Sequence, residues 1–243
     1  MQSTEWLTPR LVRIVFGGEG LDGFDAGEFT DSYVKLQVPD SPRTRSYTVR
    51  AWDPERELLT IDFVVHGDEG IIGPWAATAR PGDRLHLRGP GGAYAPEPGA
   101  DWHLMIGDQS VIPAIAASLE RIPARRPVRV LLQVDHADDE LELHTPGDLD
   151  LRWIHGGGEL ALVDALREQP WLPGDVHAFV HGEAASVRAL RRFLVVERSV
   201  ARERLSISGY WKRSRTDEEW RADKPEWNRL VEADLDGLSA AGI

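Results

Sequence analysis

Cysteine is missing from this 243-residue chain, and the chain contains no long apolar run. Without cysteine it forms no disulfide, ligates no iron–sulfur cluster through thiolates and has no thiol nucleophile. Any redox chemistry therefore requires a bound cofactor. No segment approaches the roughly 20 consecutive apolar residues of a membrane span. Residues 1–5 lack the basic and apolar regions of a signal peptide, so we expect a cytoplasmic protein.

Positive charge is scarce as well. The chain has 28 Lys and Arg against 40 Asp and Glu, a net charge of −12, and only three lysines. This acidity argues against a nucleic-acid or anionic-membrane partner. The eight histidines show no spacing that pairs them with carboxylates on one helix, so no metal site is predicted. The length suits one large domain or two small ones.

The first half has the pattern of short strands separated by Gly, Pro and Asp. Leu59, Ile61, Phe63 and Val65 alternate with more polar residues, as in a strand with one buried face. This spacing predicts a six-stranded antiparallel β-barrel. A short helix is predicted at residues 74–79. The main expected strands cover residues 11–16, 33–38, 45–51, 58–65 and 84–88.

After residue 102 the spacing of apolar residues changes, and strand-like segments alternate with helical ones. This alternation predicts a doubly wound parallel sheet, which binds ligands beyond the carboxyl ends of its strands. Residues 95–99 form the linker between the halves. We expect strands at 103–106, 128–134, 151–155, 176–180 and 205–208, and helices at 111–121, 160–167 and 184–198. The pattern of the acidic tail, residues 216–238, predicts a helix, and Pro225 is expected to break or start a helix within it.

A short phrase on one expected strand indicates a cofactor. In Arg45-Ser46-Tyr47-Thr48, the arginine and the tyrosine lie two residues apart, so both side chains share a face of the strand. The tyrosine ring suits a flat isoalloxazine ring. The arginine suits a pyrophosphate, which it can bind with a forked, charge-assisted contact. Together with His66-Gly67 and the glycines of 89–92, this phrase indicates a flavin enzyme, although a Tyr-Thr pair also occurs in ordinary sheet packing.

The order of such phrases resembles the ferredoxin–NADP reductase superfamily, and within it the siderophore-interacting proteins, which are FAD-dependent ferric-siderophore reductases. No single phrase is specific, but ten occur in the family's order. They are residues 7–13, 31–36, 45–50, 62–67, 75–76, 81–83, 89–92, 107–108, 182–184 and 209–211.

The resemblance implies where the flavin binds. Arg45, Tyr47 and Thr48 would hold its ring and phosphates, and backbone N–H groups of residues 70–76 would face the pyrophosphate at a helix start. The loop departs from the family pattern, because Gly70-Ile71-Ile72 replaces Gly-Pro-Ala. The full expected set is Arg45, Ser46, Tyr47, Thr48, Asp62, Val64, His66, Gly67, Gly70, Trp75 and Ala76.

The resemblance also places NADPH or NADH on the second domain. The phrases around Asp108 and Glu183 each end a strand and begin a helix, where the helix dipole favours an anion. Neither is the Gly-x-Gly-x-x-Gly fingerprint, and acidic capping residues are the alternative. Family members commonly have Asp-Glu-Thr where this chain has Asp-Gln-Ser. The expected residues are Asp108, Gln109, Gly182, Glu183 and Tyr210.

Three basic residues are expected to receive an anionic ferric siderophore. Family members gather basic side chains around the flavin edge, and Lys35, Lys212 and Arg213 match this pattern. Lys212, Arg213 and Arg215 equally suit a nucleotide 2′-phosphate, and each of these basic residues also suits a solvated surface charge. In a chain of charge −12, an anionic substrate requires such a local basic region.

The resulting expectation is a monomeric FAD-dependent reductase that passes electrons from NAD(P)H through the flavin to ferric siderophores. No catalytic side chain is required, because the flavin mediates the transfer. The expected domains are 1–98 for FAD, 99–215 for NAD(P)H and 216–243 for the helical tail. The alternatives are a flavin reductase or general NAD(P)H oxidoreductase with a different acceptor, and a flavoprotein that receives electrons from a protein donor.

Overall fold

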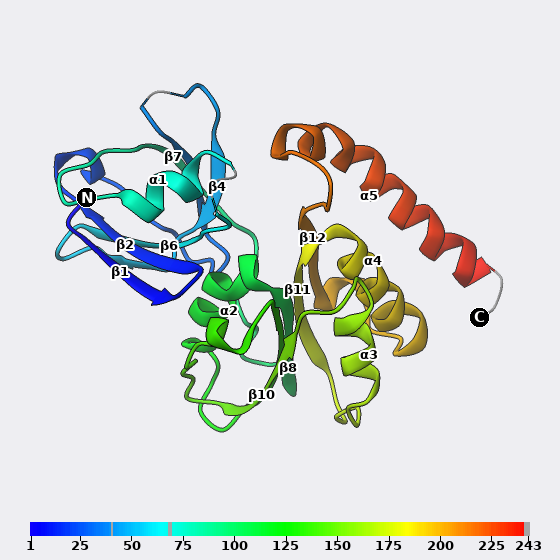
Figure 1. Ribbon diagram of the computed structural model, residues 1–243. Helices are drawn as coiled ribbons and strands as arrows, with labels where there is room; N and C mark the ends of the chain where they lie inside the picture. The colour runs from blue at the N-terminus through cyan, green and yellow to red at the C-terminus, as the bar shows by residue number, and fades with distance from the viewer. Residues whose placement is uncertain (40, 68–69, 241–243) are drawn as a thin grey trace. The chain divides into compact units, whose positions relative to one another are not determined.

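The computed structural model describes residues 1–39, 41–67 and 70–240, including the side chains as far as residue 233 (Figure 1). The chain forms two compact units. Unit 1 comprises Met1–Pro96, Ile112–Ile122 and His136–Pro146, and unit 2 comprises Glu97–Val111, Pro123–Asp135 and Gly147–Ile243. Two segments from beyond residue 98, the expected end of the first domain, therefore pack in unit 1.

Unit 1 contains two antiparallel sheets around one core. The four-stranded sheet has the order β1-β2-β6-β5, and the three-stranded sheet has the order β4-β3-β7. Strand β1 is not among the expected strands, because four of its six side chains are exposed and it lacks the alternation of a buried face. The elements of unit 1 are β1 Ser3–Thr8, β2 Leu11–Gly17, η1 Glu19–Leu21, β3 Tyr33–Gln37, β4 Arg45–Thr48, β5 Ala51–Asp53, β6 Leu58–Val64, α1 Ile72–Thr78, β7 His86–Gly91, α2 Ile112–Leu119 and η3 Ala137–Asp139.

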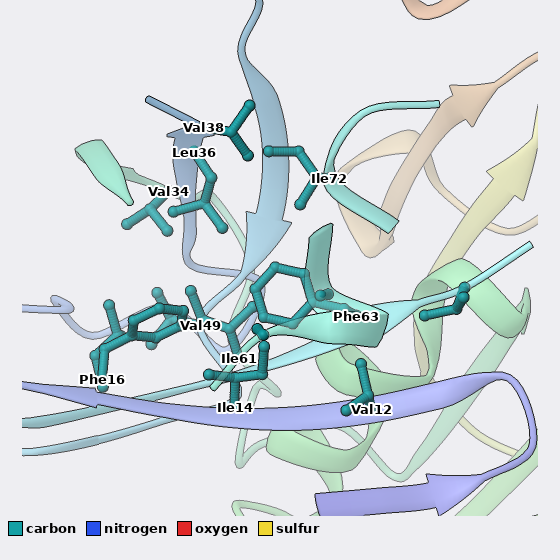
Figure 2. Packing of buried hydrophobic residues seen from close by; sticks show 14 of the residues in the cluster. Val12, Ile14, Phe16, Val34, Leu36, Val38, Val49, Ile61, Phe63 and Ile72 are labelled. Atoms are coloured by element: carbon teal, nitrogen blue, oxygen red, sulfur yellow. The ribbon is translucent and has the colours of Figure 1, made fainter. Parts of the chain in front are cut away.

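Alternating side chains from both sheets build the core of unit 1. Val34 and Leu36 point inward from β3, and Ile61 and Phe63 from β6, each at most 1% exposed. Figure 2 shows Val34 and Leu36 of β3, then Val38 just after its end, following one another beside the core. The alternation that predicted these strands is thus confirmed as a buried face.

The expected strand 45–51 is divided in the structure. Residues 45–48 form β4 and pair with β3, whereas residues 51–53 form β5 and pair with β6 in the other sheet. Val49, which is 5% exposed, turns the chain over the core between the two sheets. The one expected strand is therefore two strands in different sheets, and both contribute side chains to the same core.

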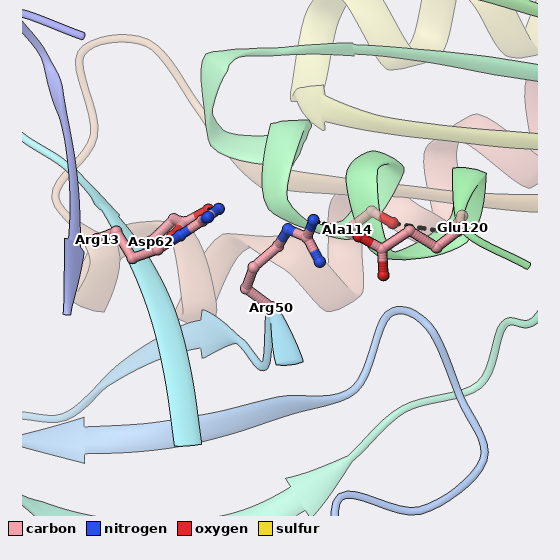
Figure 3. A network of polar contacts seen from close by, with 6 residues as sticks. Arg13, Arg50, Asp62, Ala114 and Glu120 are labelled. Atoms are coloured by element: carbon pink, nitrogen blue, oxygen red, sulfur yellow. Dashed lines mark hydrogen bonds and ion pairs between the residues drawn. The ribbon is translucent and has the colours of Figure 1, made fainter. Parts of the chain in front are cut away.

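Ion pairs and buried hydroxyl groups hold α2 and segment 136–146 in unit 1. The Arg50 Nη2 atom lies 2.5 Å from Glu120 Oε1, next to α2, as Figure 3 shows. Ser118 on α2 lies 2.7 Å from the hydroxyl of Thr30, and both residues are buried. Arg10 donates to the buried carboxylate of Asp139 across 2.6 Å.

Unit 2 is the predicted doubly wound domain. Its five strands are parallel in the order β10-β9-β8-β11-β12, so the strand order reverses between β8 and β11. Helices α3 and α4 pack against each other and cover one face of the sheet (Figure 1). The elements are β8 Trp102–Asp108, η2 Gln109–Val111, β9 Pro127–Val134, β10 Asp148–His155, α3 Ala161–Arg167, β11 Val176–Glu183, α4 Ala184–Arg192, the π-helix η4 Phe193–Glu197, η5 Arg202–Arg204, β12 Leu205–Trp211 and α5 Asp217–Ala240.

The C-terminal helix is confirmed, but the break expected at Pro225 is wrong. Helix α5 runs from Asp217 to Ala240 with Pro225 inside it. A proline in a helix removes one hydrogen bond and costs about 3 kcal/mol. Trp220 and Val231 lie on either side of it, each 2% exposed, so packing holds both flanking turns. The predicted tail also includes residues 241–243, which lie outside the described residues.

In the described part of the chain, no helix is both long enough and apolar enough to cross a bilayer.

Candidate functional site

An aromatic cluster lies at the boundary of the core of unit 1. The ring of Tyr47 lies against that of Phe63, with 4.7 Å between centroids, and Trp75 lies 6.3 Å from Phe63. Phe16 stacks on Trp75 at 6.5 Å. Phe63 is completely buried, whereas Tyr47 and Trp75 are half-buried. The cluster therefore presents two partly open rings that are held from behind by the core.

The expected common face of Arg45 and Tyr47 is confirmed by the strand register. Tyr47 is opposite Val34 and Arg45 is opposite Leu36, so both follow the inward face of β3. Arg45 and Tyr47 are half-buried and Ser46 is exposed. Ser46 and Thr48 share the opposite face. The structure thus places a cation two residues from Tyr47, on the same face of β4.

The loop after β6 contains the other expected flavin residues. Val64 ends β6, His66 is exposed, and Gly67 and Gly70 adopt positive φ values of 56° and 86°. The N-cap residue of α1, Ile71, makes no side-chain hydrogen bond to the start of the helix. Ala76 is 1% exposed and packs into the core.

Asp62 has a structural partner. It is directly opposite Arg13 in the β2–β6 register, and the two form a forked ion pair with distances of 2.7 and 2.8 Å. Asp62 is 4% exposed. The hydrogen bond to Asp62 raises the pKa of Arg13, against the effect of burial. This ion pair accounts for Asp62 without a ligand (Figure 3).

In unit 2, Asp108 connects the carboxyl ends of three strands. Its Oδ1 accepts hydrogen bonds from the backbone N–H and the hydroxyl of Ser110, at 2.9 and 2.5 Å. Its Oδ2 accepts from the backbone N–H of Glu183 at 2.7 Å and from the indole N–H of Trp211 at 2.9 Å. Burial raises the pKa of Asp108, and these hydrogen bonds oppose the rise.

Glu183 serves as the cap of α4, which was the alternative that the sequence left open. Its Oε2 accepts from the backbone N–H groups of Ala185 and Ser186 at 2.7 and 3.1 Å, and its Oε1 accepts from the N–H of Arg213 at 3.1 Å. Gly182 adopts φ +127°, and a Cβ there would lie 2.5 Å from Asp108 Oδ2. The expected nucleotide residues Asp108, Gly182 and Glu183 therefore meet at the point where the strand order reverses.

Gln109 and Tyr210 flank this network in unit 2. Gln109 is 7% exposed, and its side-chain nitrogen has no hydrogen-bond partner among the described residues. The ring of Tyr210 lies 4.9 Å from that of His181, which is itself buried. Lys212 is half-buried and Arg213 is exposed, and both follow β12.

Sequence reasoning missed the structural roles of Trp211 and Arg88. Trp211 is 40% exposed at the carboxyl end of β12, and the phrase Gly209-Tyr210-Trp211 was the available signal. Arg88 lies directly opposite Lys35 across β3 and β7. Only the register of the sheet reveals that pairing. No group of three His, Asp or Glu suited to a metal ion occurs in the described part of the chain.

Both halves of the chain match one family. The siderophore-interacting FAD-binding domain matches residues 1–43 and 39–94, and the siderophore-interacting protein domain matches residues 100–214. The chain is 41% identical to an uncharacterised protein of Mycobacterium tuberculosis, over 96% of this chain and 94% of that one. It is 32% identical to the ferric vibriobactin reductase of Vibrio cholerae, over 90% of each chain. It is 30% identical to the NADPH-dependent ferric-chelate reductase of Escherichia coli, over 85% of this chain and 89% of that one.

Solved structures point to the same family. The siderophore-interacting protein of Aeromonas hydrophila superposes with a TM-score of 0.82 at 28% identity, covering 93% of this chain and 94% of that one. Ferredoxin–NADP⁺ reductase of Plasmodium falciparum shares the fold, with a TM-score of 0.65 at 12% identity over 86% of this chain and 94% of that one. With both of its halves matched and this fold in common, the chain belongs to the siderophore-interacting protein family.

Proposed function

We propose that this protein is an FAD-dependent oxidoreductase that uses NADPH or NADH to reduce Fe(III) in siderophores. The observation that carries the proposal is the aromatic cluster of Tyr47, Phe63 and Trp75 beside Arg45, in a segment that matches an FAD-binding domain. Partly open aromatic rings next to a cation fit the ring and the phosphates of FAD. Relatives named as ferric reductases support the reaction class.

The proposed roles follow the geometry of unit 1. The half-buried rings of Tyr47 and Trp75 support the flavin ring, and Arg45 pairs with its phosphates. Thr48 and the backbone at His66, Gly67 and Gly70 complete the contacts. The positive φ values of the two glycines turn this backbone without a side chain in the way. Bound FAD supplies the exchange between two-electron and one-electron chemistry, so no side-chain acid or base is required.

We assign FAD to residues 1–98 and the nicotinamide nucleotide to residues 99–215. The carboxyl ends of β8 and β11 support the second assignment, since ligands of doubly wound sheets bind where the strand order reverses. Reduction of Fe(III) to Fe(II) weakens binding by hard oxygen donors, so the chelate releases its iron. We further propose that the protein is a monomer and that it acts in the cytoplasm.

A protein electron donor is the second candidate. Both oxygens of Asp108 already accept hydrogen bonds from Ser110, Glu183 and Trp211. The Asp108 carboxylate is thus already hydrogen-bonded within unit 2. This favours electron delivery from a protein donor, which needs no nucleotide contact at Asp108.

Anaerobic absorbance spectroscopy tests the proposal. We expect flavin bands that bleach with NADPH or NADH and return on addition of a ferric siderophore. A yellow protein that neither nucleotide bleaches supports the protein donor. Absence of flavin after reconstitution refutes the proposal.

Variants of unit 1 locate the flavin site. Tyr47→Ala should weaken FAD binding about tenfold or more, which is the loss expected for one stacked ring, while Tyr47→Phe retains it. Trp6→Ala removes a 48% exposed aromatic residue from β1 and serves as the matched control. Equal FAD affinity in Tyr47→Ala and Trp6→Ala would contradict the assignment of Tyr47.

A further inference from the structure

The ends of two neighbouring strands of unit 2 form a rim that carries negative charge only. Strands β9 and β10 are parallel and adjacent, so their carboxyl ends lie at the same edge of the sheet. Residues 133–135 at the end of β9 are QVD, and residues 155–160 at the end of β10 are HGGGEL. We call these nine residues the acidic rim. They include two exposed acids, Asp135 and Glu159, and neither lysine nor arginine.

Hydrogen bonds of the backbone fix the shape of the acidic rim. The N–H of Gly156 donates to the carbonyl of Val134 at 2.8 Å, and the side-chain nitrogen of Gln133 donates to the carbonyl of Gly156 at 2.7 Å. Gly156 and Gly157 adopt φ values of 59° and 87°, and an added Cβ at Gly157 would lie 2.8 Å from Cβ of Ala161. This backbone disfavours a side chain at both glycines, so it keeps a cationic side chain out of the middle of the rim.

Asp135 lies beside the first turn of the domain. Gln133 is directly opposite Asp108 in the β8–β9 register, and Asp135 follows Gln133 by two residues. Neighbouring strands lie about 4.8 Å apart, and two residues along a strand span about 7 Å. The Asp135 carboxylate forms no ion pair or hydrogen bond with any residue that the structure describes. It is therefore open to a ligand that binds at this edge of the sheet.

The strand order indicates which part of a nucleotide lies next to Asp135. In doubly wound domains the pyrophosphate lies at the turn after the first strand, and the adenosine ribose contacts an acid after the second. Here these places are the turn at Gln109 after β8, and Asp135 after β9. Gln109 supports the first place, because it is 7% exposed and its side-chain nitrogen is a donor with no partner among the described residues. A carboxylate at the second place accepts hydrogen bonds from ribose hydroxyls and repels a phosphate there.

The basic residues that suit a 2′-phosphate lie beyond the point where the strand order reverses. Lys212, Arg213 and Arg215 follow β12, which is two strands away from β8 and on the opposite side of it from β9. The guanidinium of Arg215 is already paired with Asp223 at 2.9 Å. The end of the second strand, where the ribose is expected, therefore has an acid and no matching cation of its own.

We propose that Asp135 makes this protein selective for NADH, because its carboxylate accepts hydrogen bonds from the 2′- and 3′-hydroxyl groups of the adenosine ribose and repels the 2′-phosphate of NADPH. The inference rests on the proposed function for the presence of a nucleotide, and it names which of the two is used. Glu159 adds to the repulsion from the end of β10. The relative in Escherichia coli is named as NADPH-dependent, so this chain differs from that relative in its reductant.

Two nucleotide fragments test the inference without any redox step. ADP-ribose and 2′-phospho-ADP-ribose differ only at the 2′ position, and calorimetric titration of the full chain measures the dissociation constant of each. We expect the wild type to bind ADP-ribose about tenfold more tightly, which corresponds to one charge-assisted contact. Asp135→Asn should remove most of this difference, and Asp135→Glu should keep it. Anaerobic bleaching of the flavin by NADH and by NADPH should follow the same order.

Two further variants separate a local effect from a change in total charge. Asp148→Asn removes the same charge from an exposed acid at the other end of β10, and it should leave the ratio of the two dissociation constants unchanged. Gly158→Arg adds a cation to the acidic rim at a position where no atom lies within 4 Å of an added Cβ. Combined with Asp135→Asn, it should reverse the preference in favour of 2′-phospho-ADP-ribose.

Three results would overturn the inference. They are tighter binding of 2′-phospho-ADP-ribose by the wild type, a ratio in Asp135→Asn within about twofold of the wild type, and an equal change in Asp148→Asn. If Lys212→Ala alone weakens binding of the 2′-phospho fragment, the 2′-phosphate is bound after β12 and the inference also fails.

The outcomes distinguish this inference from the proposed function. If either nucleotide bleaches the flavin while Asp135→Asn keeps the ratio of the wild type, only the role of Asp135 fails. If the wild type binds neither fragment, the inference fails, and flavin bleaching then decides the proposed function separately. A flavin that neither nucleotide bleaches points to the protein donor.

Discussion

Trp211 donates its indole N–H to Oδ2 of Asp108 across 2.9 Å, although the two residues are 103 positions apart in the chain. The bond passes from β12 to β8, two strands away in the sheet order. Gly182 on the intervening strand has no side chain, and an added Cβ would collide with the same oxygen. The three strand ends are therefore held together by one buried carboxylate.

Replacing Trp211 with phenylalanine should remove this bond and keep most of the ring. A hydrogen bond to a charged group contributes about 2 kcal/mol, so we expect the free energy of unfolding to fall by about that amount. Urea denaturation measures it. Trp6→Phe, at a 48% exposed position on β1, is the control for loss of an indole. Equal stability of Trp211→Phe and Trp6→Phe would contradict the role of the bond.

Gly182→Ala should be more damaging than substitution of an ordinary glycine. The positive φ of 127° disfavours any side chain, and the new Cβ would displace the Asp108 carboxylate from Glu183 and Trp211. Backbone strain of this kind costs about 1–3 kcal/mol before the lost hydrogen bonds are counted. Thermal unfolding compares it with Gly158→Ala, where no atom lies within 4 Å of the added Cβ. A similar melting temperature for the two variants would refute the prediction.

Residues 1–98 expressed alone should not form the compact unit seen in the whole chain. The fragment lacks Ser118, Glu120 and Asp139, which contact Thr30, Arg50 and Arg10 in unit 1. Without α2, the buried hydroxyl of Thr30 loses the Ser118 hydroxyl that lies 2.7 Å away in the whole chain. Circular dichroism and dye binding to exposed apolar surface should show a non-cooperative melt. A cooperative transition like that of the full chain would show that the first half folds by itself.

Acidification should destabilise the protein below about pH 6.5 through two buried histidines. Burial, followed by the charges of His177 and Arg126, lowers the pKa of His103 to about 4. Burial, followed by the charge of Lys224, lowers the pKa of His181 to about 3. The unfolded chain then takes up protons that the folded chain does not. The stabilisation is complete above the unfolded pKa and is lost as pH falls towards these folded values.

For each histidine, the free energy of unfolding should fall by about 1.4 kcal/mol per pH unit between its unfolded and its folded pKa. Urea midpoints at pH 7, 6 and 5 measure it. Neither ring nitrogen of His103 has a hydrogen-bond partner among the described residues, so His103→Leu should flatten the dependence without leaving a polar group unpaired. His144→Gln, on an exposed side chain, is the control. An unchanged slope in His103→Leu would show that another group causes the loss.

Local patterns in the sequence determined the strands and helices because each depends on neighbours within a few residues. The alternation at Leu59, Ile61 and Phe63 is a direct consequence of one buried face, and the parallel sheet follows from strands that alternate with helices. Patterns failed where packing overrode them. Pro225 continues α5 because Trp220 and Val231 are buried on either side, and the expected strand 45–51 divides between two sheets.

The site shows the same division between local and long-range information. The common face of Arg45 and Tyr47 followed from their spacing, because side chains two apart on a strand point the same way. The ion pair that occupies Asp62, the bond from Trp211 to Asp108 and the pairing of Lys35 with Arg88 join residues far apart in the chain. Such partners depend on strand order and register, which arise from the burial of the whole core. Only the tertiary structure could therefore decide which charged side chains are already paired and which remain open to a ligand.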